Sequence, residues 1–207
     1  MMVGIRKIKM GVWLVGVLLL VSATVAGAAT QPAATISFDF TRIDNVATNQ
    51  YAVWIEDSKG YYVRTLSATH FAATGGFNRR PDTLPLWVGV SQWGKYFPAD
   101  LDAISAATKT TAGSSGEVDA VSTATPPTGA VVVNWDLKDS KGQMVPAGTY
   151  TYKIEGNIYK AGRVVWTGTI KVGDGPNSSV ATAQYLPDKA AATEKGLLIT
   201  NVKASYK

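Results

Sequence analysis

The chain has 207 residues, with 20 Lys and Arg against 15 Asp and Glu, so its formal net charge is +5. It contains no cysteine and a single histidine, His70. The lack of cysteine excludes thiol catalysis, iron–sulfur clusters and attachment of c-type haem. One histidine without cysteine does not supply a usual zinc site, so we expect no metal site.

Residues 1–28 predict a secretory signal peptide. Arg6, Lys7 and Lys9 precede an apolar run over residues 12–21, and residues 26–28 read Ala-Gly-Ala, as at a cleavage site. The apolar run is short for a membrane-spanning helix, although a retained anchor is the alternative. We expect a periplasmic or otherwise extracytoplasmic protein. Without this segment 17 Lys and Arg stand against 15 Asp and Glu, a net charge of +2, which does not favour nucleic-acid binding.

Residues 29–207 predict one all-β domain, an antiparallel immunoglobulin-like β-sandwich. Ile36, Phe38 and Phe40 alternate with polar residues, which is typical of a half-buried strand. Six further segments are predicted as strands: 51–55, 61–66, 131–135, 149–154, 163–172 and 198–206. We expect eight or nine strands in all, a loose polar segment over residues 173–193, and no convincing helix after the signal peptide.

A long loop over residues 98–130 carries nearly the same heptapeptide twice. Residues 102–108 and 119–125 both read Asp-Ala-(Ile/Val)-Ser-x-Ala-Thr. Such Ala-, Ser- and Thr-rich stretches also occur as ordinary connections between strands. The doubled heptapeptide is nevertheless the feature of the sequence that points most directly to a function.

The heptapeptide resembles the flavinylation motif, Asp-x-x-(Ser/Thr)-Gly-Ala-(Ser/Thr), of the FMN-carrying subunits of sodium-pumping and Rnf-type redox complexes. In those subunits a transferase esterifies FMN, through its phosphate, onto the last Ser or Thr. The resemblance implies covalent FMN as cofactor and two acceptors, Thr125 and Thr108. It assigns the rest of the motif to recognition: Asp119, Asp102, Ser122, Ser105, Ala124 and Ala107. The motif has Gly where Thr123 and Ala106 stand here, and Gly permits a positive φ and a close approach of the transferase.

The order of features along the chain resembles an uncharacterised family of predicted periplasmic proteins, often encoded with, or fused to, the FAD:protein FMN transferase. The features are Leu-Pro-Leu-Trp at 84–87, the second motif copy, Trp-Asp at 135–136, Pro-x-Gly-x-Tyr at 146–150 and a last strand near 199–202. Residues 135–150 also resemble a hairpin of bacterial immunoglobulin-like modules. The family resemblance implies that the transferase and membrane or periplasmic redox proteins are partners.

Other candidate residues have a structural and a functional interpretation. His70 is expected to be structural or solvated. Arg79 and Arg80 are expected in a solvated loop, with contact to a flavin phosphate as the alternative. The aromatic cluster of Trp87, Trp93, Tyr96 and Phe97 is expected in the core, with packing over a flavin ring as the alternative.

Two functional hypotheses remain open. The first is an extracytoplasmic electron-transfer protein that carries FMN on threonine. The second is a non-catalytic immunoglobulin-like binding or structural module. A hydrolase is less favoured, because Asp136 and Asp139 lie in a turn, where Asp forms local hydrogen bonds. The sequence therefore identifies no catalytic residues and favours a redox carrier over a catalyst.

Overall fold

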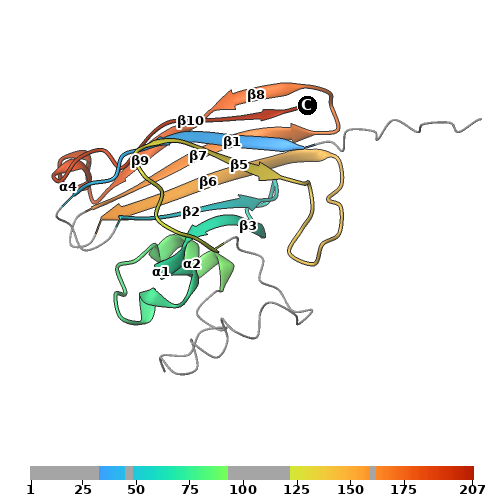
Figure 1. The fold of residues 1–207 in the computed structure, drawn as a ribbon. Helices are drawn as coiled ribbons and strands as arrows, with labels where there is room; N and C mark the ends of the chain where they lie inside the picture. The colour runs from blue at the N-terminus through green and yellow to red at the C-terminus, as the bar shows by residue number, and fades with distance from the viewer. Residues whose placement is uncertain (1–32, 45–48, 93–121, 159–161) are drawn as a thin grey trace, which may run out of the picture. The chain divides into compact units, whose positions relative to one another are not determined.

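The computed structural model describes residues 33–44, 49–92, 122–158 and 162–207, which are coloured in Figure 1. The predicted signal peptide and the first motif copy lie outside the described residues, as does the start of the second copy. The structure therefore gives no account of Asp102, Ser105, Ala107, Thr108 or Asp119. In the part of the chain that it covers, no helix is long and apolar enough to cross a membrane.

Four antiparallel strands form the first sheet, called sheet A here, in the order β5-β1-β10-β8. Their bounds are β1 Ala34–Phe40, β5 Gly129–Trp135, β8 Asn177–Val180 and β10 Ile199–Tyr206. β1 pairs with β5 along its whole length and with β10 on its other side. The first and last strands of the described chain are thus neighbours at the centre of sheet A (Figure 1).

Six strands form sheet B, in the order β4-β3-β2-β6-β7-β9. Their bounds are β2 Asn49–Glu56, β3 Tyr62–Thr69, β4 Ser122–Thr123, β6 Gly148–Ile158, β7 Arg163–Val172 and β9 Thr182–Leu186. All neighbouring strands are antiparallel except β3 and β4, which are parallel. The all-β sandwich is confirmed, while its immunoglobulin-like topology stays a prediction.

The core between the two sheets follows the period-two alternation of the strands. β1 buries Ile36, Phe38 and Phe40 and leaves the residues between them half-buried. The ring centroid of Tyr51 on β2 lies 5.4 Å from that of Phe38 and 5.6 Å from that of Phe40. These tilted and edge-on ring contacts join the inner faces of the two sheets.

The outer face of sheet B is also covered, by a helical segment that connects β3 toward β4 (Figure 1). This segment, called the insertion here, contains α1 His70–Ala73, the 3₁₀ turn η1 Gly76–Asn78 and α2 Pro85–Ser91. It builds a second apolar cluster against the sheet, from Ala52, Trp54, Ala68, Ala72, Ala73, Phe77, Leu84 and Trp87. The expectation that no helix follows the signal peptide is wrong, because helices of one or two turns are too short to show a helical period.

Two predictions for the second half of the chain need correction. β5 belongs to sheet A and β6 to sheet B, so these two strands do not pair. Within residues 135–150 the predicted hairpin is reduced to an antiparallel bridge between Lys138 and Met144 around a turn. The rings of Trp135 and Tyr150 still meet in the core, 5.2 Å apart. Residues 173–193, expected to be loose, contain β8, β9 and the helix α4 Lys189–Thr193. β8 alternates between half-buried and exposed residues, and its short polar sequence gives little strand signal.

Candidate functional site

The described end of the second motif copy lies at an edge of sheet B. Ser122 and Thr123 form β4, whose parallel pairing sets Ser122 opposite Ala68 and Thr123 opposite Thr69. Ser122 and Ala124 are exposed, and Thr125 is half-buried. Also within the predicted loop, β5 begins at Gly129. Ser122 and Ala124 therefore lie at the surface, in a segment that is fixed to a strand edge.

The only histidine of the chain holds this segment. His70 follows β3 directly, and its Nδ1 lies 2.9 Å from the Oγ of Ser122 in a hydrogen bond. The parallel register explains the contact, because His70 lies two residues after Ala68, the pairing partner of Ser122. The imidazole is exposed, in agreement with the expectation of a structural or solvated histidine.

The position of the missing motif glycine is a strand position in this chain. Thr123 lies in β4 and pairs with Thr69, so its backbone is extended. Extended backbone suits a β-branched residue and does not call for the positive φ that glycine permits. The departure from the glycine therefore fits the local structure of the second copy.

The chain then passes from sheet B to sheet A. After Pro126 and Pro127, the Oγ1 of Thr128 accepts a hydrogen bond of 2.9 Å from the backbone N–H of Arg42, two residues after β1. Gly129 begins β5 on the edge of sheet A. Thr125 thus lies between two hydrogen bonds that fix the chain: one joins His70 to Ser122, and the other joins Arg42 to Thr128.

The insertion is positioned by polar contacts beneath it. Trp87 is fully buried, and its indole Nε1 donates to the Oγ1 of Thr65 at 2.8 Å. Its backbone N–H donates to the carboxylate of Glu155 on β6 at 2.8 Å, and the N–H of Leu86 donates to the same carboxylate at 3.3 Å. The alternative role of Trp87 against a flavin ring does not fit this burial. The other predicted aromatic residues, Trp93, Tyr96 and Phe97, lie outside the described residues.

Glu155 is a fully buried carboxyl group between sheet B and the insertion. Burial raises its pKa, and the N–H groups of Trp87 and Leu86 together with Arg163 act in the opposite direction. The Nε of Arg163 lies 3.5 Å from Glu155 Oε1. Sequence reasoning missed this pair, because Glu155 follows the predicted strand of residues 149–154 and Arg163 is an alternating polar residue at the start of the next strand. The insertion, far away in sequence, buries Glu155, whereas Arg163 is half-buried.

The other charged residues considered as candidates are exposed or make local contacts. Arg79 is exposed, and the guanidinium carbon of Arg80 lies 5.0 Å from the ring centroid of Phe71. Asp139 Oδ1 accepts the backbone N–H of Lys141 and of Gln143, both at 2.9 Å. Among the described residues, no group of three or more His, Asp or Glu is placed to hold a metal ion.

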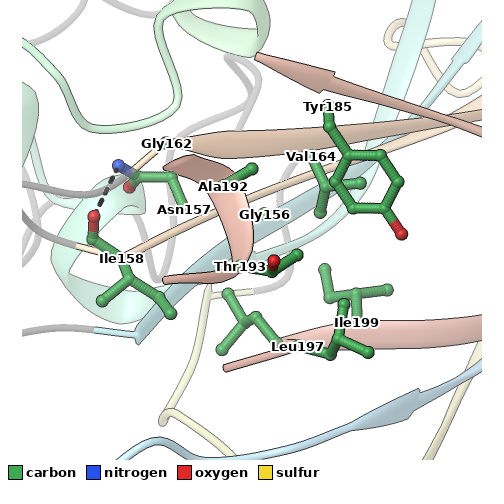
Figure 2. A pocket seen from close by; sticks show the side chains of 11 residues that line it. Gly156, Asn157, Ile158, Gly162, Val164, Tyr185, Ala192, Thr193, Leu197 and Ile199 are labelled. Carbon is green, nitrogen blue, oxygen red and sulfur yellow. Dashed lines mark hydrogen bonds between the residues drawn. The ribbon is translucent and has the colours of Figure 1, made fainter. Parts of the chain in front are cut away.

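Two cavities lie at the end of sheet B where β6 and β7 meet. The first is enclosed by mainly apolar side chains of β6, β7, β9, α4 and β10, and its volume is about 10 Å³ (Figure 2). It has room for about one water molecule and cannot hold a flavin. The second is an open pocket of about 350 Å³, called the Arg163 pocket here, lined by Asp82, Asn157, Gly162, Arg163, Leu186 and Pro187. This volume is within the range of small-molecule sites.

A family model described as "Predicted periplasmic protein (DUF2271)" matches residues 33–188. The chain belongs to the DUF2271 family. The match spans the insertion, residues 122–125 of the motif and every strand of sheet B. The description confirms the extracytoplasmic location that the sequence predicts. No curated protein and no solved structure matches the chain.

The DUF2271 match ends before β10, which begins at Ile199 and forms the centre of sheet A. The sandwich of this DUF2271 protein is therefore completed by a strand outside the matched residues. The candidate site itself lies within the match, since His70, Ser122 and Thr125 all precede residue 188. The family description names no ligand and no reaction.

Proposed function

We propose that this protein is an extracytoplasmic electron-transfer protein that carries FMN bound covalently to Thr125, with Thr108 as a second acceptor. One observation carries the proposal. At the described end of the motif, Ser122 and Ala124 are exposed and Thr125 is half-buried, next to the strand edge where Ser122 pairs with β3. An exposed segment with a fixed backbone is what a modifying enzyme needs to reach a threonine hydroxyl.

The attachment uses a hydroxyl of this chain and a nucleotide supplied by the partner. The FAD:protein FMN transferase is that partner. The Oγ1 of Thr125 forms a bond to the FMN phosphorus of FAD, the P–O–P bond of FAD breaks, AMP leaves, and the hydroxyl proton is lost to a base of the transferase. No oxidation or reduction accompanies this step. FMN then supplies the redox chemistry, and the chain positions it.

The anchoring of the motif supports this role. His70 and the β3 edge fix Ser122, while Thr128 accepts from the backbone of Arg42 on the sheet A side. Thr125 lies between these anchors and is half-buried, so its hydroxyl is carried on a backbone that is fixed on both sides. A covalent tether also suits a protein outside the cytoplasm, where a lost flavin is not easily replaced. The redox partners are membrane or periplasmic proteins.

The experiment is the intact mass of the mature protein from cells with and without the transferase. We expect an increase of one or two FMN units only where the transferase is present. Thr125→Ala removes one unit, and Thr108→Ala removes the other where both sites are occupied. Thr182→Ala, an exposed threonine on β9, is the matched control and leaves the mass increase unchanged.

An unmodified mass with an active transferase present contradicts the proposal. The transferase is shown to be active by modification of a known FMN-carrying subunit in the same cells. In that case the alternative, a non-catalytic binding or structural module built on the sandwich, becomes the better interpretation.

A further inference from the structure

The Arg163 pocket is lined by a side chain with one donor that no described residue satisfies. The Nε–H of Arg163 is buried and has no hydrogen-bond acceptor among the described residues. Glu155 Oε1 is 3.5 Å away in an ion pair, and the same carboxylate accepts the N–H groups of Leu86 and Trp87. A buried donor without an acceptor is costly, and such groups often mark a site that something else completes.

Asn157 is a second donor at the pocket, and its own hydrogen bond is long. Its side chain is 4% exposed and lines the pocket. The contact of its Nδ2 is with the carbonyl oxygen of the next residue, Ile158, at 3.5 Å, which is the long limit for a hydrogen bond (Figure 2). The pocket therefore offers two donors, a guanidinium and a buried amide, on neighbouring strands β6 and β7, which pair Asn157 with Arg163.

We propose that the Arg163 pocket binds the oxyanion group of a small molecule, a carboxylate or a phosphate ester. Arginine presents N–H donors in a planar fork that matches both groups in a bidentate manner. The volume of about 350 Å³ admits a small metabolite, and Leu186 and Pro187 offer it an apolar wall. This inference is independent of the proposed flavin attachment.

The charges around the pocket predict how a substitution at Asp82 changes the affinity for an anion. The Glu155 carboxylate accepts two backbone N–H groups and is not among the residues that line the pocket, whereas Asp82 is exposed and lines it. A carboxylate on the rim repels an anion in the pocket. Removing it therefore strengthens the binding of an oxyanion, and would weaken the binding of a cation.

The test is calorimetric titration of the unmodified mature protein with inorganic phosphate, with lactate and with glycerol as the neutral control. We expect saturable binding of at least one anion, with a Kd of about 1 mM or tighter, and no heat of binding with glycerol. Binding of phosphate alone assigns the site to phosphate esters, and binding of lactate alone assigns it to carboxylates. No binding of either anion overturns the proposal.

Variants locate the binding. Arg163→Lys keeps the charge and loses the fork, and we expect binding about tenfold weaker or worse. Asp82→Asn is expected to tighten binding about two- to fivefold. Lys171→Met removes an exposed cation from the same strand and leaves binding unchanged. Equal binding in the wild type and Arg163→Lys, or weaker binding in Asp82→Asn, overturns the proposal, and circular dichroism shows that each variant is folded.

Discussion

The two faces of sheet B are packed in different ways. The inner face meets sheet A through apolar and aromatic side chains, among them Tyr51, Tyr152 and Ile154. The outer face meets the insertion through a smaller apolar cluster, and buried polar residues lie in this sheet: Gln50, Thr65, Glu155 and Asn157. The inner face thus stabilises the domain by burial, whereas the outer face holds a short segment in one position by directed hydrogen bonds.

This difference explains how short helices keep a defined place. α2 has seven residues, too few for a stable helix in isolation. It begins with Pro85 after Leu84 in the left-handed conformation, φ 46°, and the Glu155 carboxylate accepts N–H groups of its first turn. A carboxylate there satisfies donors that have no partner inside the helix. The polar groups beneath the insertion therefore act as its anchor.

The largest loss of stability is expected from a substitution in the core on the inner face of sheet B. Trp135→Ala removes a fully buried indole that meets the ring of Tyr150 and donates from Nε1 to the Lys138 carbonyl at 2.9 Å. We expect a loss of about 3–5 kcal/mol in the free energy of unfolding, measured by urea denaturation. Val132→Ala, an exposed residue on the same strand, is the control and changes stability little. A loss below about 1 kcal/mol for Trp135→Ala would show that the inner core does not dominate stability.

A smaller effect, dependent on pH, is expected beneath the insertion. Glu155→Gln leaves one acceptor oxygen for two N–H groups, at a cost of about 1–3 kcal/mol. Because burial raises the pKa of Glu155 above its ordinary 4.5, the folded protein binds more protons than the unfolded chain between the two pKa values. The stability of the wild type relative to Glu155→Gln is then fully present below the ordinary carboxyl pKa and falls as pH rises through the raised value.

Urea unfolding of both proteins from acidic to neutral pH measures this dependence. Glu194→Gln, which alters an exposed carboxyl group, is the matched control and gives no such trend. A stability difference for Glu155→Gln that grows as pH rises would mean that the two N–H groups and Arg163 outweigh burial. That result would reverse the direction of the pKa shift.

A substitution at Trp87 tests whether the outer face of sheet B can be destabilised without the inner face. Trp87→Phe keeps most of the apolar volume and loses the donor to Thr65, for which we expect a cost of about 1–2 kcal/mol. Amide hydrogen exchange should accelerate in residues 70–91 and stay slow in β1 and β10, because the sandwich core is untouched. Tyr61→Phe, at an exposed tyrosine, is the control. Uniformly faster exchange would show that the insertion and the sandwich unfold as one unit.

The sequence predicts the core between the two sheets better than the cluster beneath the insertion. The first follows from alternation within each strand, whereas the second depends on a distant segment. Period-two alternation in β1 and β2 identifies Ile36, Phe38 and Val53 as inward residues, and all three are buried. Alternation over residues 149–154 predicts an outer row at Thr149, Thr151 and Lys153, and the predicted strand ends there. β6 continues to Ile158, and Glu155, the next residue of that row, is buried because the insertion covers it. Alternation shows which residues of a strand share a face, but it does not show whether a distant segment covers that face.

The sequence predicts the residues of the candidate site but not the contacts that hold them. The repeated heptapeptide identifies Ser122, Ala124 and Thr125 by similarity, and the structure adds that β4 pairs with the β3 edge. The contact of Ser122 with His70 spans 52 positions in the sequence. Parallel pairing of a two-residue strand leaves no pattern in sequence, so this contact could be found only in the fold.

The smallest effect is expected at this edge. Ser122→Ala breaks an exposed hydrogen bond to His70, and we expect a loss of at most about 0.5 kcal/mol in global stability. Hydrogen exchange in β4 should nevertheless accelerate, since two residues paired with β3 keep little else to hold them. Ser178→Ala, an exposed serine on β8, is the control. The double variant with His70→Ala should add almost nothing to either single change, because both remove the same bond. Additive effects would show that His70 and Ser122 act separately, and that β4 is held at the edge of sheet B by its backbone pairing alone.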